Sequence, residues 1–186
     1  MAGKSFVDQY GNANPDKRID IILDYYKKFP SIIEGQKKIL VLKIKNDREY
    51  NRQHRNEDMG IHFMGNELSD PTACEAIENV YVEKTVFRGE DISELVQDME
   101  DADNMAYRRQ FYILQKMQEE YIILQAQLPF LNSNEKRIFA LCMEDGHDFQ
   151  SIAEQEGMQI ESVRSRVWQI RKKIKNSAVN YMEEYL

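Results

Sequence analysis

The sequence predicts an all-α chain, with long helices over most of its length and three shorter helices near the C-terminus. Apolar residues recur at spacings of three and four over long stretches, which is the period of a helix. The 186 residues include only 8 Gly and 4 Pro, so few positions interrupt a helix. No run alternates apolar and polar residues as a half-buried strand does.

The composition excludes several classes of protein. Hydrophobic residues make up 42% of the chain and charged residues 31%, which suits a folded core with much helix surface in water. No apolar stretch approaches the roughly 18 residues of a membrane span, and the first residues lack the apolar centre of a secretory signal. Cys74 and Cys142 are far apart in sequence, so we expect no disulfide framework and a cytoplasmic protein.

The charge is unevenly distributed along the chain. Residues 160–177 hold six basic residues and one acidic residue, or +5, so the rest of the chain carries −7 − 5 = −12. A basic element on an acidic body is expected of a protein that binds DNA through one surface only. For a basic run taken alone, a solvated helix face is the alternative.

Two helices are predicted in the first 60 residues. Pro15 fits the first position of one helix, whose apolar residues continue at helical spacing to Phe29. Pro30 is predicted to end this helix, and Ser31 can cap the second. The apolar pattern of the second helix is lost within the polar run at 45–58.

A loop is predicted at 58–66, and a third helix follows it. Ser69 or Asp70 can cap the third helix, Pro71 fits its first position, and Gly89 ends it.

The segment 91–128 is predicted as one unbroken helix. It carries a heptad-like apolar stripe that cannot be buried by the helix alone. We expect this stripe to pack against the two earlier helices or against its copy in a second chain. The stripe consists of Leu95, Met99, Ala102, Ala106, Ile113, Met117, Tyr121, Leu124 and Leu128.

Three helices are predicted at the C-terminal end. Asn132 or Ser133 can cap the first, which ends at Gly146. Residues 149–156 form the second, and Gly157 permits the positive φ of a tight turn into the third.

The third of these helices begins near Ile160. Val163, Val167, Ile170 and Ile174 are spaced four, three and four residues apart, so they form one apolar face against the two preceding helices. The opposite side is then free, and an α-helix fits the major groove of DNA.

The stretch 131–175 resembles region four of bacterial sigma factors, closest to the extracytoplasmic-function type. That family has a leucine-threonine-x-x-glutamate start, two glycine turns, an isoleucine-alanine helix and a recognition helix with a serine/threonine-valine-basic-serine-arginine run. The resemblance implies a helix-turn-helix DNA-binding domain at 129–177; a three-helix unit that binds protein is the alternative. The matching residues are Leu131, Glu135, Leu141, Gly146, Ile152, Ala153, Gly157 and Ser162-Val163-Arg164-Ser165-Arg166.

The resemblance also implies roles for individual residues. The candidates for contacts with base edges are Glu161, Ser162, Ser165 and Arg166, with Gln169 weaker because it lies further from the helix start. The candidates for phosphate contacts, which position a protein without reading sequence, are Arg164, Arg171, Lys172 and Lys173. For Trp168, packing at the rim of the domain is favoured over contact with DNA.

The predicted boundaries of the other parts of the chain follow from placing the DNA-binding domain at 129–177. Residues 1–14 are polar and predicted to be loose. Residues 15–128 form a helical region for oligomerisation or partner binding, and 178–186 form a C-terminal tail.

The first 130 residues lack the aromatic and basic pattern with which a complete sigma factor opens DNA. The chain is more similar to the ArpU-like and RinA-like regulators of phage late genes in Gram-positive hosts, in its architecture and in a short motif at 64–72. This resemblance implies a transcriptional regulator, phage- or prophage-encoded, that acts on late-gene promoters with host RNA polymerase in the bacterial cytoplasm.

The expected partners are double-stranded DNA, RNA polymerase and a second copy, since the long helices can supply dimerisation, a polymerase contact, or both. Two other classes remain open. A phage small terminase subunit also combines a helix-turn-helix with long helices, but forms a ring. A sigma-like activator or anti-activator uses the same fold on a protein and shows no salt-dependent DNA affinity.

No catalytic, metal or cofactor site is predicted. His54, His62 and His147 form no zinc-binding pattern, and no glycine-rich nucleotide-binding motif occurs. The acidic cluster at 98–103 is expected to be a solvated helix face. We therefore expect no enzyme activity and no cofactor.

Overall fold

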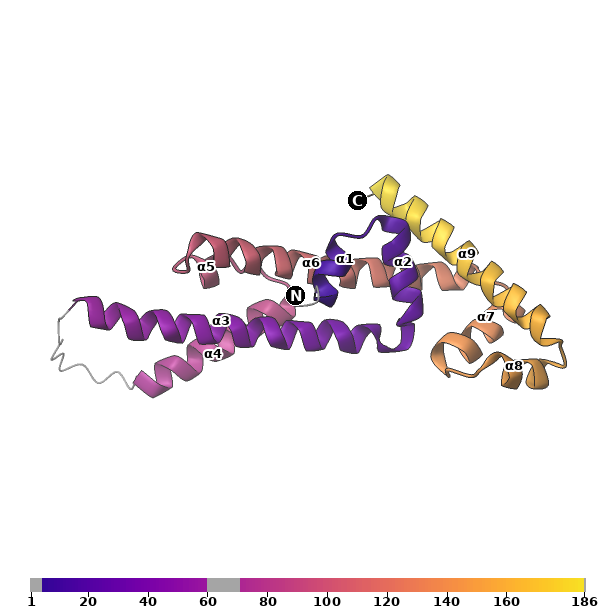
Figure 1. Cartoon of the computed structure of the whole chain (residues 1–186), viewed down its shortest axis with the longest axis horizontal. Helices are drawn as coiled ribbons and strands as arrows, with labels where there is room; N and C mark the ends of the chain where they lie inside the picture. Colours follow the sequence, from indigo (N-terminus) through magenta and orange to yellow (C-terminus); the bar gives the residue numbers. More distant parts are fainter. Residues whose placement is uncertain (1–4, 60–70, 186) are drawn as a thin grey trace. The chain divides into compact units, whose positions relative to one another are not determined.

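The computed structural model describes residues 5–59 and 71–185. Within these ranges all regular structure is helical and no strand occurs (Figure 1), which confirms the all-α class. None of the helices in the same ranges has the length and apolar character needed to span a membrane. The predicted loop at 58–66 beyond Met59, the caps Ser69 and Asp70, and His62 lie outside the described residues.

The chain divides into two compact units. Unit 1 comprises Met1–Ile32 and Lys116–Leu186, and unit 2 comprises Ile33–Gln115. Unit 1 holds α1 (Phe6–Gly11), α2 (Pro15–Asp24), η1 (Tyr26–Lys28), the end of α6 (Asp101–Gln127), η2 (Leu128–Phe130), α7 (Ser133–Phe139), η3 (Ala140–Glu144), α8 (Phe149–Glu156) and α9 (Ile160–Tyr185). Unit 2 holds most of α3 (Phe29–Met59), α4 (Pro71–Arg88), α5 (Ser93–Val96) and the start of α6.

These units group the chain differently from the predicted division at residue 129, because α2 packs against α9 and η1 against η3. The ends also differ from the prediction. Residues 6–11, predicted to be loose, form α1 and bury Val7 and Tyr10. Residues 178–185 of the predicted tail continue α9, and Ala178, Val179 and Met182 are buried.

Pro15 begins α2 as predicted, and the Asn14 side chain caps it by accepting from the Lys17 N–H. The prediction that Pro30 ends the first helix and Ser31 caps the next is wrong. α2 already ends at Asp24, and Pro30 lies in the first turn of α3. A proline is tolerated there because the N–H groups of the first turn have no partner within the helix.

The single helix predicted at 91–128 is wrong at its start, because α5 and α6 are separated at 97–100. Polar side chains satisfy the backbone there. Asp91 accepts from the Ser93 N–H at 2.9 Å, and Asn104 Nδ2 donates to the Val96 carbonyl at 2.8 Å. Five residues of the predicted stripe are buried, namely Leu95, Met99, Ile113, Met117 and Leu124, whereas Ala102 and Ala106 are exposed.

A buried ion pair fixes α1 and α2 against α6. Glu120 is fully buried and accepts hydrogen bonds from Tyr10 Oη at 2.5 Å and Arg18 Nε at 2.9 Å. Arg18 Nη1 donates to the Ala13 carbonyl at 2.7 Å. Both charges are therefore compensated, as burial of an ion pair requires.

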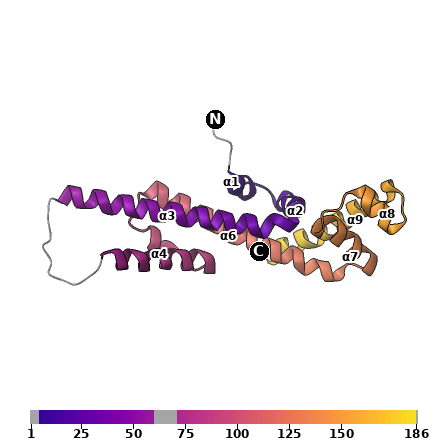
Figure 2. The same ribbon diagram turned by 90° about the horizontal axis from the view of Figure 1, so that it is seen from below.

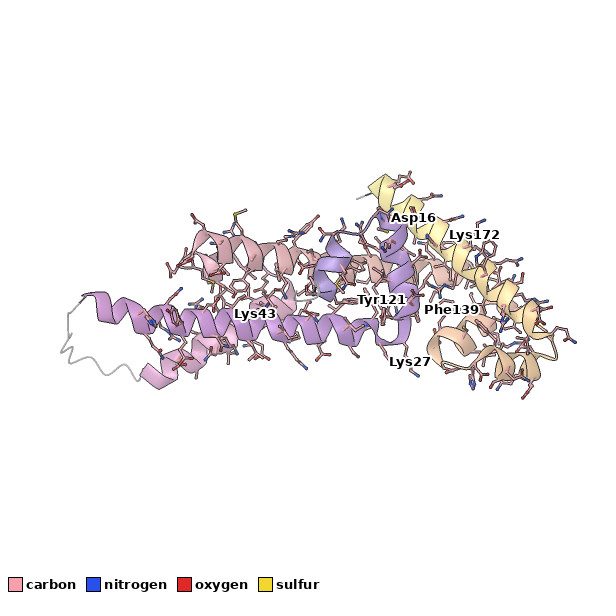
Figure 3. All side chains as sticks on the ribbon, in the orientation of Figure 1. Asp16, Lys27, Lys43, Tyr121, Phe139 and Lys172 are labelled. Carbon is pink, nitrogen blue, oxygen red and sulfur yellow. The ribbon has the colours of Figure 1, made fainter. Side chains whose placement is uncertain are left out.

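Aromatic rings connect α6 to α7 beside this ion pair. The Tyr26 ring lies 5.6 Å from that of Tyr121 and 5.1 Å from that of Phe139, and the Phe29 ring stacks on Tyr121 at 5.7 Å (Figure 3 labels Tyr121 and Phe139). Contacts of this kind favour one arrangement of the helices. They fix the start of the C-terminal helices on the rest of unit 1.

Burial of these tyrosines predicts a loss of stability in alkali. Burial raises the pKa of Tyr26 to about 12 and raises the pKa of Tyr10 and Tyr121 above the usual 10. The folded state therefore retains protons that the unfolded state releases above pH 10. Stability is fully present below pH 10 and falls as pH rises above it, by at most about 1.4 kcal/mol per pH unit for each tyrosine. Thermal unfolding at pH 8 to 11 measures this, and Tyr10→Phe is expected to make the decline shallower. An equal decline in the variant would contradict the role of Tyr10.

Candidate nucleic-acid interface

The first C-terminal helix, α7, begins at a capping box. Asn132 Oδ1 accepts from the Glu135 N–H at 2.9 Å, and the Asn132 N–H donates to Glu135 Oε2 at 2.8 Å. The sequence left Asn132 and Ser133 open as caps, and Asn132 is the one used. The reciprocal pair satisfies two backbone N–H groups at the helix start and so fixes where α7 begins.

The turns around α8 follow the sequence closely. α8 spans Phe149–Glu156, as predicted, and Asp148 caps it by accepting from the Ser151 N–H at 2.7 Å. Gly157 has φ +63°, which confirms the predicted left-handed turn into α9. The preceding helix loses regular α geometry after Phe139 and continues as the π-helical turn η3 before Gly146.

The apolar stripe of α9 is confirmed. Val163, Val167, Ile170 and Ile174 are all buried, and Ile138, Phe139 and Ile152 are buried residues of α7 and α8, which both contact α9. A helix held by one stripe presents its opposite side to solvent.

The structure places the nine predicted site residues together on α9. Eight are exposed, and Arg171 alone is half-buried. Ser165 and Lys172 lie on the side opposite the stripe, because each stands two residues, or about 200°, from the nearest residues of the stripe on either side. Arg164 and Arg166 flank this row. The exposed eight are Glu161, Ser162, Arg164, Ser165, Arg166, Gln169, Lys172 and Lys173.

Trp168 stands out on this surface. Trp168 is 61% exposed, so most of the residue does not pack against the domain. Packing at the rim of the domain was the role favoured from the sequence. Lys172 Nζ lies 4.9 Å from the ring centroid (Figure 3 labels Lys172). A cation is attracted to the face of an aromatic ring, so this contact favours one position of the Trp168 side chain while the ammonium group remains exposed to water.

The cations of α9 fall into two groups. Three are paired with acids: Arg171 with Asp24, Lys173 with Glu135 at 2.9 Å, and Lys175 with Asp20 at 2.8 Å and Asp16 at 3.3 Å. The remaining three, Arg164, Arg166 and Lys172, form no ion pair with any residue in the described ranges.

The two groups differ in their readiness to bind an anion. Arg164 lies over the Phe149 ring at 5.9 Å, and Arg166 lines a cavity of about 270 Å³ with Gln169 and Asn134. These contacts leave the guanidinium charges uncompensated. Arg171 and Lys173 must release their carboxylate partners before they can bind a phosphate. The cost is small, because surface ion pairs of this kind contribute only about 0–1 kcal/mol to stability.

An acidic face of α2 lies against the C-terminal half of α9. It consists of Asp16, Asp20 and Asp24, spaced by four residues, and it contacts Arg171 and Lys175 (Figure 3 labels Asp16). The hydrogen bond with Asp20 raises the pKa of Lys175, so this lysine stays charged. This face was not predicted from the sequence, although the regular spacing of the three acids indicates a common side of a helix.

Asn134 is a further residue that the sequence analysis missed. It lines the cavity beside Arg166 and Gln169 and is exposed. The resemblance implies contacts by the last helix only, whereas the start of α7 adds polar groups to the same surface.

No model of a known protein family, no curated protein and no solved structure matches this chain. In the described ranges, no group of three or more His, Cys, Asp or Glu side chains could hold a metal ion. His54 and His147 are exposed, and His54 Nδ1 lies 2.9 Å from the Tyr50 carbonyl oxygen. The interpretation of function therefore rests on the surface of α9.

Proposed function

We propose that this chain is a sequence-specific regulator of transcription that binds double-stranded DNA. In this proposal α7, α8 and α9 form the helix-turn-helix unit, and α9 is its recognition helix. The observation that carries the proposal is the division of α9 into a buried apolar stripe and an opposite exposed side, with three cations that form no ion pair in the described ranges. The −12 charge of the rest of the chain supports binding through this surface alone.

The exposed side of α9 offers the groups that a major groove requires. Ser165 and Gln169 can donate to and accept from base edges, and Arg166 can bond two acceptors of guanine. Arg164 lies beside Ser165, and Lys172 follows Ser165 two turns further along the same face; both are placed to contact phosphates. Arg171 and Lys173 join them once their carboxylate partners are displaced.

The narrower proposal is that the protein acts at phage late-gene promoters with host RNA polymerase. Its support is the resemblance of 131–175 to sigma region four and of the whole chain to the ArpU-like and RinA-like group. The capping box and the left-handed Gly157 agree with the turns that this resemblance implies.

Selection from a pool of random duplexes tests the proposal and does not require the target sequence to be known. The expected result is one enriched motif, with an affinity that falls steeply with salt because phosphate contacts release counterions. The absence of any enriched motif and of salt-dependent binding would contradict the proposal and favour a protein partner. A ring of roughly eight or more subunits bound to the motif would favour the terminase class.

The acidic face of α2 is expected to restrain DNA binding. Replacing Asp16, Asp20 and Asp24 by asparagine removes three negative charges within reach of the phosphates and frees Arg171. We expect the affinity for the selected duplex to rise by roughly three- to tenfold at low salt, and by less above about 0.2 M salt because charges are screened. A fluorescence anisotropy titration measures both values. Unchanged affinity at low salt would show that α2 does not affect the interface.

A further inference from the structure

Helix α4 has apolar residues on two opposite sides, of which one is buried and the other is exposed. Val82, Thr85 and Val86 are at most 1% exposed. On the other side Ile77 is 70% exposed and Val80 is 49% exposed. A helix that is apolar on both sides is expected to be covered on both.

Ion pairs with α3 determine which side of α4 faces inward. Arg52 contacts Glu78 at 3.3 Å and Glu75 at 3.9 Å, and Arg48 contacts Glu78 at 3.8 Å. Because these pairs occur along the first half of α4, the helix is held with the Ile77 side outward. Figure 2 shows α4 at the margin of unit 2.

The outward side has the spacing of a coiled-coil seam. Ala73, Ile77, Val80, Lys84 and Phe87 follow one another at four, three, four and three residues. This is the alternation of d and a positions in two heptads. All five are at least partly exposed. Tyr81, which is 50% exposed, lies beside the seam at an e position.

The charged residues that flank the seam are complementary to a second copy. With Ile77 at an a position, Glu83 falls at g and Arg88 at the following e, five residues later. In a parallel two-stranded coiled coil, g of one helix faces this e of its partner. The side chains of Glu83 and Arg88 are 60% and 66% exposed, and their ion pairs with Lys45 and Glu90 are long, at 3.8 and 3.6 Å.

Lys84 bears on the number of helices in the coiled coil. It occupies the second of the two a positions in this seam, where a single polar residue specifies register and oligomeric state at a cost in stability. In a parallel pair its ammonium group can reach the glutamate at position 83 of the second copy, so the charge need not be buried without compensation.

We propose that α4 pairs with α4 of a second copy as a parallel, two-stranded coiled coil. The seam comprises Ala73, Ile77, Val80, Lys84 and Phe87. Two heptads give a weak contact between free peptides, but α4 is already ordered on α3, so pairing does not have to fold it. The alternative stripe for pairing, predicted on 91–128, is largely buried within the chain. Self-association through α4 does not depend on DNA binding.

Sedimentation equilibrium of the full chain without DNA, from about 1 to about 300 µM, tests the proposal. We expect a monomer–dimer equilibrium that Ile77→Lys shifts to at least about tenfold higher concentration. Met105→Lys, at a residue that is 72% exposed on α6, is the matched control and should leave the equilibrium unchanged. A monomer throughout the range, or a dimer that survives Ile77→Lys, would overturn the proposal.

Charge reversal tests the parallel register on exposed side chains that folding does not require. Glu83→Arg places arginine opposite Arg88 of the second copy, and Arg88→Glu places glutamate opposite Glu83 of the second copy. Each variant alone should dimerise at least about tenfold more weakly than the wild type, whereas an equimolar mixture should form a heterodimer. Circular dichroism checks that both variants keep their helix content. Failure of the mixture to associate would exclude the parallel pairing.

Discussion

Glu120→Ala is expected to lower the free energy of unfolding by about 3–5 kcal/mol, because it leaves the charge of Arg18 buried without a partner. For a chain of this size the change corresponds to a fall in Tm on the order of 10 °C. Glu120 also accepts a hydrogen bond from the Tyr10 hydroxyl. The same change therefore removes the hydrogen bonds that connect Tyr10 of α1 and Arg18 of α2 to α6. Thermal unfolding followed by circular dichroism measures the effect.

Glu119→Ala is the matched control for this experiment. Glu119 is the neighbouring residue on α6 and is exposed, so its substitution should change stability by no more than about 0.5 kcal/mol. A combined replacement of Tyr10, Arg18 and Glu120 by Phe, Met and Leu should recover much of the stability, since buried ion networks can be replaced by apolar groups. Equal stability of the Glu119 and Glu120 variants would contradict the role of the ion pair in unit 1.

Removing the three cations of α9 that have no ion-pair partner in the described ranges is expected to weaken binding to the selected duplex by roughly 100-fold at low salt. Each charge-assisted contact of Arg164, Arg166 or Lys172 is taken to contribute about 1 kcal/mol. The dependence of affinity on salt should also become shallower, by about 0.9 in the logarithmic slope for each phosphate that is no longer neutralised. An anisotropy titration at several salt concentrations measures both quantities for the triple alanine variant.

The matched control removes the same net charge elsewhere. Lys27, Lys28 and Arg108 are exposed cations that lie outside α7, α8 and α9. Their combined replacement by alanine should change the affinity by less than about threefold, since none of them belongs to the proposed recognition helix and exposed charges are screened. A comparable weakening in both triple variants would mean that net charge, and not the surface of α9, determines the affinity.

The sequence predicted those parts of the fold that depend on local signals. The bounds of α8, the left-handed Gly157 and the buried stripe of α9 each follow from a few neighbouring residues. The break between α5 and α6 could not be predicted in this way. Its segment contains no proline or glycine, and Asn104 stabilises it by donating to the Val96 carbonyl, a contact that apolar spacing does not reveal.

The residues of the candidate site could be predicted from the sequence. Which of its cations are paired with acids could not. The sequence placed all nine predicted residues on one helix, where the structure also has them. It could not separate Arg166 from Arg171, because the acid that pairs with Arg171 is Asp24, which lies far away in the chain. Ion pairing across the fold decides which cations remain available for phosphates.

The most direct test of the central claim is a dimethyl sulfate footprint on the selected duplex, since this reagent methylates guanine N7 in the major groove. If α9 reads the major groove, the wild type should protect guanines within one short segment. Arg166→Ala should restore their reactivity at protein concentrations that still saturate the duplex. Saturated binding without protection of any guanine N7 in a guanine-containing motif would contradict α9 as a recognition helix.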